Sequence, residues 1–146
     1  MGKIMSTIVA LVPRTMVEYV WDDCTPFLEM VLAKAPEDIG LDKVYNRCLS
    51  GETLLVVITD GSEIIAVNTL EVRELDSGNK ILFLPIIGGS RTEEWQDRFI
   101  DLAHEIARHH DCIELRGMAV RKAWLRKLSR YGFEEHFVTL KCKVKE

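Results

Sequence analysis

Residues 80–110 carry the strongest structural signal in the chain, with KILFLPIIGG at 80–89 followed by SRTEEWQDRFIDLAHEIARHH at 90–110. The first part is almost wholly apolar, which predicts a strand in the interior of a sheet. The second part has apolar residues at helical spacing and predicts an amphipathic helix. Its apolar stripe consists of Trp95, Phe99, Leu102, Ala103, Ile106 and Ala107. Ser90 and Glu93 have the spacing of a capping box, so we expect the helix to start there.

Five segments precede this pair and predict two helices and the first strands of an antiparallel meander. Proline disrupts helices, so we expect the first helix to break at Thr25-Pro26. Asp60-Gly61 predicts a two-residue hairpin turn, because glycine adopts positive φ without steric cost. The expected limits are residues 8–12 (strand), 16–31 (helix), 41–49 (helix), 53–59 (strand) and 63–72 (strand).

Three segments follow the pair: a strand over 112–115, a helix over 120–131 ended by Gly132, and a strand over 137–144 in which apolar and polar residues alternate. The full order is β-α-α-β-β-β-α-β-α-β. It predicts an α+β (mixed α/β) fold with a central mixed sheet of about six or seven strands flanked by four helices. The length of 146 residues fits one domain, which we expect over residues 1–146.

The composition excludes several classes of protein. Hydrophobic residues make up 47% and charged residues 29%, which is typical of a globular protein and not of a disordered or fibrous one. No apolar run reaches the roughly 18–20 residues that span a bilayer, so we expect no membrane contact. A net charge of −4 argues against broad electrostatic binding of nucleic acid.

The cysteines show no paired spacing, which indicates reduced thiols in a cytoplasmic compartment. They are Cys24, Cys48, Cys112 and Cys142. His109 and His110 lie close to Cys112, but side chains at a helix end diverge and no second ligand pair exists. We therefore expect no metal site.

The element order resembles that of the GNAT acetyltransferase superfamily along essentially the whole chain. Residues 81–133 carry most of the likeness: the strand LFLPIIGG, the helix after it, the strand CIELRG, and the helix AVRKAWLRKLSRYGF, which ends in Gly132-Phe133. The chain looks most like small GNAT-like proteins encoded in phage genomes. That subgroup resemblance implies a place in the host cytoplasm or in the virion.

A glycine-rich turn that opens a helix is an anion site, because free amides and the helix dipole point at one spot. In the resembled family this spot holds the pyrophosphate of coenzyme A. The resemblance therefore implies an acetyl-CoA site at Ile87, Gly88, Gly89, Ser90, Arg91 and Thr92. The family's loop has the form Arg/Gln-x-x-Gly-x-Gly/Ala, whereas GGSRTE has adjacent glycines followed by two glutamates. A plain strand-to-helix turn is the alternative interpretation.

Acetyl transfer needs a base for the amine and an acid for the leaving thiolate. Many members of the family place a tyrosine four residues before the closing glycine, but Leu128 stands there in this chain. Glu71 and Glu114, on strands beside the central one, are the candidate bases. The alternative for each is a solvated strand residue, and the catalytic set is not identified from the sequence.

Charge is unevenly distributed along the chain. Residues 1–75 hold 12 acids and 6 bases (net −6), and residues 76–146 hold 11 acids and 13 bases (net +2). The acidic half suits an amine substrate. The last helix has a basic face that predicts contact with coenzyme A phosphates or an acidic partner protein, a solvated face being the alternative. This face consists of Arg121, Lys122, Arg126, Lys127 and Arg130.

Two functions fit these observations. The first is an acetyl-CoA-dependent N-acetyltransferase acting on an amine-bearing small molecule or protein, which we favour because most members of the resembled superfamily are enzymes. The alternative is a non-catalytic GNAT-like binding or structural protein, such as a virion component or a host-interaction factor. Edge strands and a C-terminal strand ending in KCKVKE leave room for a homodimer.

Overall fold

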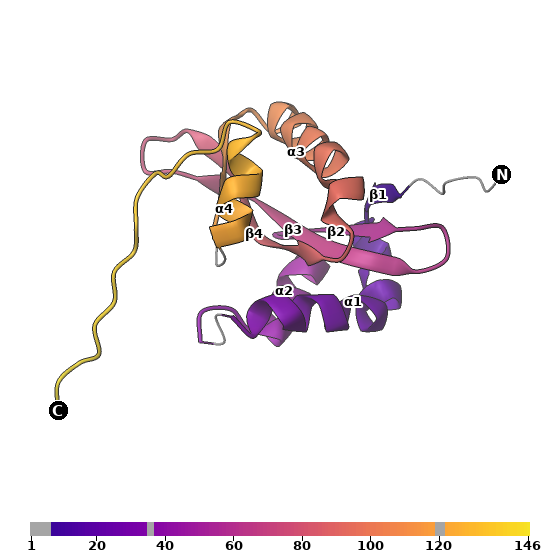
Figure 1. Cartoon of the computed structure of the whole chain (residues 1–146), viewed down its shortest axis with the longest axis horizontal. Helices are drawn as coiled ribbons and strands as arrows, with labels where there is room; N and C mark the ends of the chain where they lie inside the picture. The colour runs from indigo at the N-terminus through magenta and orange to yellow at the C-terminus, as the bar shows by residue number, and fades with distance from the viewer. Residues whose placement is uncertain (1–6, 35–36, 119–121) are drawn as a thin grey trace.

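The computed structural model describes residues 7–34, 37–118 and 122–146. Two helices lie on one face of a central sheet and two on the other (Figure 1). The elements are β1 (Ile8–Leu11), the 3-10 turn η1 (Arg14–Met16), α1 (Val17–Leu32), α2 (Leu41–Ser50), β2 (Leu54–Thr59), β3 (Ile64–Glu74), β4 (Lys80–Gly89), the 3-10 turn η2 (Thr92–Glu94), α3 (Gln96–His109), β5 (Cys112–Gly117) and α4 (Lys122–Ser129).

The strands form one mixed sheet in the order β1-β2-β3-β4-β5. Neighbours from β1 to β4 are antiparallel, whereas β4 and β5 are parallel and are joined through α3. The parallel pair needs this crossover, because only a long connection can return the chain to the same end of the sheet. The α+β fold with a mixed sheet and four helices is thereby confirmed.

The sheet has five strands in the part of the chain that the structure describes, fewer than the six or seven expected. Residues 137–144 are not a strand, and the C-terminal segment leads away from the body of the protein (Figure 1). Leu140 is 88% exposed and Val144 94% exposed. An alternating sequence favours a strand, but a strand also needs an edge to pair with. Among the described residues, no strand pairs with this segment.

Two hydrophobic cores lie on opposite sides of the sheet, because successive side chains of a strand point to opposite faces. One core packs under α3 and α4 and contains Val56, Ile58, Leu70, Leu82, Leu84, Trp95 and Phe99. The other packs under α1 and α2 and contains Cys24, Leu28, Val44, Cys48, Leu55, Val57 and Val67. The apolar stripe expected for the central helix is confirmed in α3, where only Leu102 is half-buried.

The predicted break at Thr25-Pro26 was wrong, because α1 continues through Pro26. A proline inside a helix leaves the carbonyl of the fourth preceding residue without its amide donor. That carbonyl belongs to Asp22, and the Thr25 hydroxyl donates to it at 3.0 Å. The threonine beside the proline therefore compensates for the lost backbone bond.

The start of α3 also differs from the prediction. The helix begins at Gln96 without a side-chain cap, and the predicted capping box is not formed. Instead the Ser90 amide and hydroxyl both donate to the carbonyl of Ile65, at 2.9 and 3.2 Å. Pairing with β3 thus continues past Gly89, and the chain needs η2 to turn into the helix. Tertiary hydrogen bonding outcompetes the local cap.

The hairpin between β2 and β3 forms one residue later than predicted. The Asp60 amide donates to the Glu63 carbonyl at 3.1 Å, so Gly61 and Ser62 are the central residues of the turn. The Asp60 carboxylate accepts the amides of Ser62 and Glu63, each at 3.0 Å. A carboxylate that bonds its own turn favours this placement.

Among the described helices, none is long and apolar enough to cross a membrane.

Candidate functional site

Strand β4 is the element that shapes the candidate site. Its register with β3 shifts by one residue between the pairs Thr69–Ile86 and Glu71–Phe83, which places a bulge at Leu84-Pro85. Proline suits a bulge because it has no amide for the ladder. The bulge reverses the facing of the side chains: Leu84 packs in the core under α3, whereas Ile86 packs in the core under α1.

Beyond the bulge, β4 loses its second partner. Pairing with β5 ends at Leu84–Gly117, although β4 runs on to Gly89. The Gly88 amide donates to the Asn68 side-chain oxygen at 2.8 Å, and the Ser90 amide donates to Ile65 on β3. Because successive amides of a strand point to opposite edges, Ile87 and Gly89 direct theirs toward the open edge. Among the described residues, no strand pairs with the end of β4 on the side where β5 stops.

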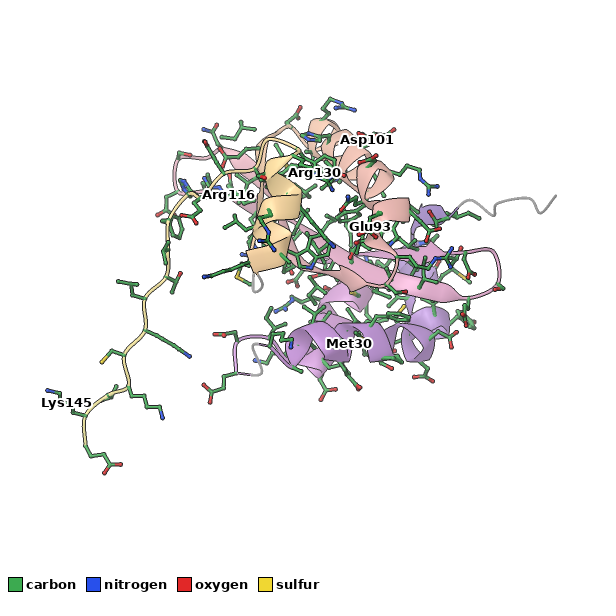
Figure 2. All side chains as sticks on the ribbon, in the orientation of Figure 1. Met30, Glu93, Asp101, Arg116, Arg130 and Lys145 are labelled. Atoms are coloured by element: carbon green, nitrogen blue, oxygen red, sulfur yellow. The ribbon has the colours of Figure 1, made fainter. Side chains whose placement is uncertain are left out.

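A cavity of about 90 Å³ lies at this open edge. It is bordered by α1 on one face of the sheet and by α4 on the other. Figure 2 shows Met30 of α1 on one side of the sheet and Arg130, which directly follows α4, on the other. The lining residues are Met30, Val31, Lys34, Pro85, Ile87, Gly88, Gly89, Met118, Trp124 and Leu128. Both helical layers therefore reach one mainly apolar cavity at the end of a strand.

Two glycines are required by close packing around this cavity. A Cβ on Gly88 would lie 2.6 Å from Cγ2 of Val31, so α1 could not approach β4 as it does. Gly89 has φ +137°, and its Cβ would lie 2.3 Å from Cβ of Ala66 on β3. Of the six predicted coenzyme A residues, Ile87, Gly88 and Gly89 line the cavity. The adjacent glycines are explained by contacts with α1 and β3.

The remaining predicted residues of this turn are engaged with protein groups. Arg91 donates to Glu94 at 2.5 Å and to Asp60 at 3.1 Å. Bonding to Glu94 raises the pKa of Arg91 above its usual value, and the same contact lowers the pKa of Glu94. Two carboxylates therefore compensate the charge of Arg91. The helix does not begin at this turn, so the expected combination of free amides and helix dipole is not formed.

A second positive group at this turn comes from α4. Lys127 donates from Nζ to the Thr92 hydroxyl at 2.9 Å, and the same Nζ lies 5.1 Å from the centre of the Trp124 ring. Trp124 in turn packs beside Trp95, with ring centres 6.5 Å apart. The exposed cations of this region are Lys122 and Arg126 on α4 and Arg130 directly after it, while Arg121 lies outside the described residues. Lys127 is thus the residue of the basic face that contacts this turn, through Thr92.

Neither candidate base lines the cavity. Glu71 is 8% exposed and accepts a hydrogen bond from Thr53 at 2.9 Å and another from Arg73 at 2.6 Å. Arg47 of α2 lies 3.9 Å from the same carboxylate. Glu114 is exposed and pairs with Arg116 at 2.7 Å. The contacts of Glu71 tie α2 to β3, a role that the sequence alone did not reveal.

Tyr131 points away from the cavity. Its hydroxyl donates to Asp97 on α3, and burial together with this carboxylate raises the pKa of Tyr131 to about 12. Leu128, which stands where the resembled family places a tyrosine, lines the cavity. Among the described lining residues, Lys34 carries the one charged side chain, and no carboxylate, histidine or tyrosine is present.

Comparison with known proteins gives matches in structure. No family model matches the chain, and no curated protein matches it in sequence. An acetyltransferase from Trypanosoma brucei is 12% identical, with a TM-score of 0.66 over 95% of this chain and 100% of that one. An aminoglycoside acetyltransferase from a soil metagenome, solved with sisomicin, is 12% identical, with a TM-score of 0.69 over 95% and 97%.

A predicted acetyltransferase from Clostridium acetobutylicum, solved with acetyl-CoA, is also 12% identical, with a TM-score of 0.69 over 94% of this chain and 96% of that one. These identities are low, so the likeness concerns the arrangement of the elements and not their side chains. It extends over almost the whole of each chain. The chain therefore has the fold of the GNAT acetyltransferases.

Proposed function

We propose that the protein is an acetyl-CoA-dependent N-acetyltransferase that acts on an amine. The observation that carries the proposal is the cavity at the open end of β4, which both helical layers border. A transferase must bring two substrates to one point, and a cavity reached from both faces of the sheet allows them to approach from opposite sides. The likeness in fold to acetyltransferases supports the same function.

The residues present fit the acyl-bearing end of acetyl-CoA. Its pantetheine arm is extended and contains amides, so it can pair with the backbone of Ile87 and Gly89 as an added strand would. The apolar lining suits an acetyl group and excludes water from it, with Val31, Trp124 and Leu128 on its sides. When bound, the thioester supplies the acyl group. Lys127 and the exposed cations of α4 supply positive charge for phosphates.

The lining also determines how the amine must lose its proton. No described lining side chain can act as a carboxylate, imidazole or phenolate base, and Lys34 is a cation. The amine therefore enters deprotonated or gives its proton to water. We expect the rate to rise with pH according to the pKa of the acceptor amine, with no bell-shaped dependence on groups of the protein.

A second function is favoured by one observation, the absence of an acid or base among the described lining residues. A GNAT-like binding protein needs no such group, and Leu128 in the place of the family's tyrosine suits that function as well. Such a protein would bind coenzyme A or another extended amide in the cavity without turnover. The two functions differ in one measurable property, which is release of free thiol.

Titration calorimetry with acetyl-CoA tests the proposal, together with a thiol-release assay over a panel of amines. Ile87→Trp fills the cavity and should raise the dissociation constant at least tenfold. Ile8→Trp makes the same change at an exposed position of β1, outside the cavity, and should leave binding unchanged. Gly89 is unsuitable for this test, because its Cβ would meet β3 and destabilise the fold.

Each outcome decides between the alternatives. Binding that Ile87→Trp weakens, with thiol release on an amine, supports the transferase. Binding of the same kind without thiol release supports the binding protein. No binding of acetyl-CoA or coenzyme A to the wild type at millimolar concentration refutes the cofactor site and with it the transferase.

A further inference from the structure

We infer that Lys34 is itself an acceptor of the acetyl group, so that the protein acetylates its own chain at this position. The inference rests on the proposed function, because it needs acetyl-CoA to enter the cavity at the end of β4. It goes further by naming an amine that the chain itself brings to the thioester. The product is a covalent modification of the protein and not a released compound.

The end of α1 places Lys34 at the cavity. Its amide donates to the Val31 carbonyl at 3.1 Å, so the chain still follows a helical turn directly after α1. Val31 lies so close to Gly88 that a Cβ on the glycine would be 2.6 Å from Cγ2 of Val31. Lys34 therefore lies about one turn beyond the contact that fixes α1 on β4, and all three residues line the cavity.

Lys34 carries the one amine among the described lining residues. The other lining side chains are apolar, and none of them has a hydroxyl, thiol, imidazole or carboxylate group. No ion pair of the described residues involves Lys34, whereas Arg91 is paired with Glu94 and Asp60. An amine that is not held by another group can turn toward a bound thioester and act as its nucleophile.

The transfer to Lys34 needs no group beyond those already named. The ammonium group first gives a proton to water, as any amine must where the described lining offers no base. The neutral nitrogen then attacks the thioester carbonyl, and a carbon–nitrogen bond forms while the carbon–sulfur bond breaks. The nitrogen gives a second proton to water, and solvent protonates the thiolate. Lys34 ends as a neutral amide, and coenzyme A leaves as the thiol.

Position takes the place of a base in this step. Holding an amine beside a thioester converts a bimolecular reaction into one within a single complex, which raises the effective concentration of the amine. Lys34 is held in this way by the fold, whereas an added amine must first bind. Acetylation of Lys34 should therefore be much faster than that of an equally exposed lysine elsewhere on the chain.

Acetylation at this position limits the site itself. A free acceptor leaves after transfer, but Lys34 keeps its acetyl group at a cavity of only about 90 Å³. The same step removes the one charged side chain of the described lining. We expect the acetylated protein to bind acetyl-CoA about tenfold more weakly, or weaker still, in calorimetry, because the cavity is then partly filled.

Peptide mapping by mass spectrometry tests the inference after the full chain is incubated with acetyl-CoA and no added amine. Lys34 should be acetylated about tenfold faster than Lys43, or faster still; Lys43 is an exposed lysine of α2 outside the cavity. A stoichiometric amount of free thiol should accompany the modification. The rate should rise with pH, because only the neutral amine attacks. Acetic anhydride, which needs no binding site, should label both exposed lysines to a similar extent.

Three variants locate the reaction. Lys34→Arg keeps the positive charge but removes the amine nucleophile, so the modification and the stoichiometric thiol should both be lost. Lys43→Arg is the matched control and should leave both unchanged. Each of these residues is exposed, so neither variant disturbs the core. Ile87→Trp fills the cavity and should slow acetylation of Lys34 about tenfold or more.

The outcomes separate this inference from the proposed function. Binding of acetyl-CoA in calorimetry without faster acetylation of Lys34 than of Lys43 overturns the inference and leaves the transferase standing. Acetylation of Lys34 without turnover on the amine panel supports the inference and limits the transfer to the chain itself. A preference for Lys34 that acetic anhydride reproduces, or that Ile87→Trp leaves unchanged, overturns the role of the cavity. No binding of acetyl-CoA overturns both proposals.

Discussion

Replacing Gly89 with alanine tests the close approach of β4 to β3 on which the cavity depends. The new Cβ would lie 2.3 Å from Cβ and 2.4 Å from Cα of Ala66, and 2.7 Å from the carbonyl oxygen of Ile65. These atoms belong to the backbone and Cβ of an interior strand, so no side-chain rotation relieves the contact. The φ of +137° is also a conformation that L residues rarely adopt.

The two effects can be given a magnitude. Backbone strain at such a φ costs about 1–3 kcal/mol, and forced overpacking costs about 1–3 kcal/mol more. We therefore expect Gly89→Ala to lower the free energy of unfolding by about 2–6 kcal/mol. That is a large share of the roughly 5–15 kcal/mol that stabilises a typical domain. Urea denaturation followed by circular dichroism measures this change, with the m-value checking that the transition stays two-state.

Gly78→Ala is the matched control. Gly78 also has a positive φ, +92°, but nothing lies within 4 Å of the position of its Cβ. It should lose only about 1–2 kcal/mol, the cost of a left-handed conformation. The difference between the two variants isolates the contact with Ala66. Equal losses in the two variants would show that β3 and β4 are not as close at Gly89 as described here.

Four further outcomes follow from particular contacts. Gly88→Ala should destabilise the protein by about 1–3 kcal/mol, because its new Cβ meets Val31. Adding Val31→Ala should restore part of this loss in a double-mutant cycle, and strictly additive effects would contradict the contact. Glu71→Ala should lower the free energy of unfolding by about 1–3 kcal/mol, because it removes the hydrogen bonds to Thr53 and Arg73. It should leave acetyl-CoA affinity unchanged in calorimetry, and a loss of affinity in a folded variant would instead place Glu71 in the site. The amides of Ser62 and Glu63, with Arg91 adding to them, hold the pKa of Asp60 below its usual value, so its contribution to stability is complete above about pH 4 and is lost as the pH falls. Asp60→Asn should flatten the acid decline in stability measured by urea denaturation at several pH values, and an unchanged slope would count against these bonds. Burial raises the pKa of Cys24 to about 12 and that of Cys48 to about 11, so both thiols should resist iodoacetamide until the protein unfolds. Mass spectrometry counts the labelled thiols, and labelling in native buffer would disprove their burial.

Local patterns in the sequence were sufficient for most of the elements. The apolar stripe of α3 and the apolar runs of β2 and β4 predicted their type, because periodicity reflects which face is buried. The signals that failed were also local. Pro26 is tolerated because the Thr25 hydroxyl donates to the carbonyl that has lost its amide donor. The serine of the expected capping box instead donates to the carbonyl of Ile65 on another strand. Both outcomes depend on hydrogen bonds that spacing alone does not reveal.

In the candidate site, too, some residues were predicted from the sequence and others were revealed only by the structure. Ile87, Gly88 and Gly89 were predicted as part of an anion-binding turn, from the glycine-rich strand end and the resemblance to the GNAT family, and the structure places them in the lining of the cavity. The cavity they border requires Val31 from α1, Lys34 just after it, and Trp124 and Leu128 from α4, which are far apart in the chain. The pairing of Arg91 with Asp60 joins residues 31 positions apart, so spacing along the chain does not reveal that this charge is compensated.

The sequence by itself thus determined the order of helices and strands as far as α4 and the apolar stripe of α3, because buried positions recur with the period of the element. Only the tertiary structure decided where β5 stops pairing with β4, which amides stay free, and which charges are compensated. Those properties depend on register and on contacts between distant segments. The alternation in residues 137–144 predicts a strand, but a strand forms only where it pairs with an edge, and no described strand of this chain pairs with the segment.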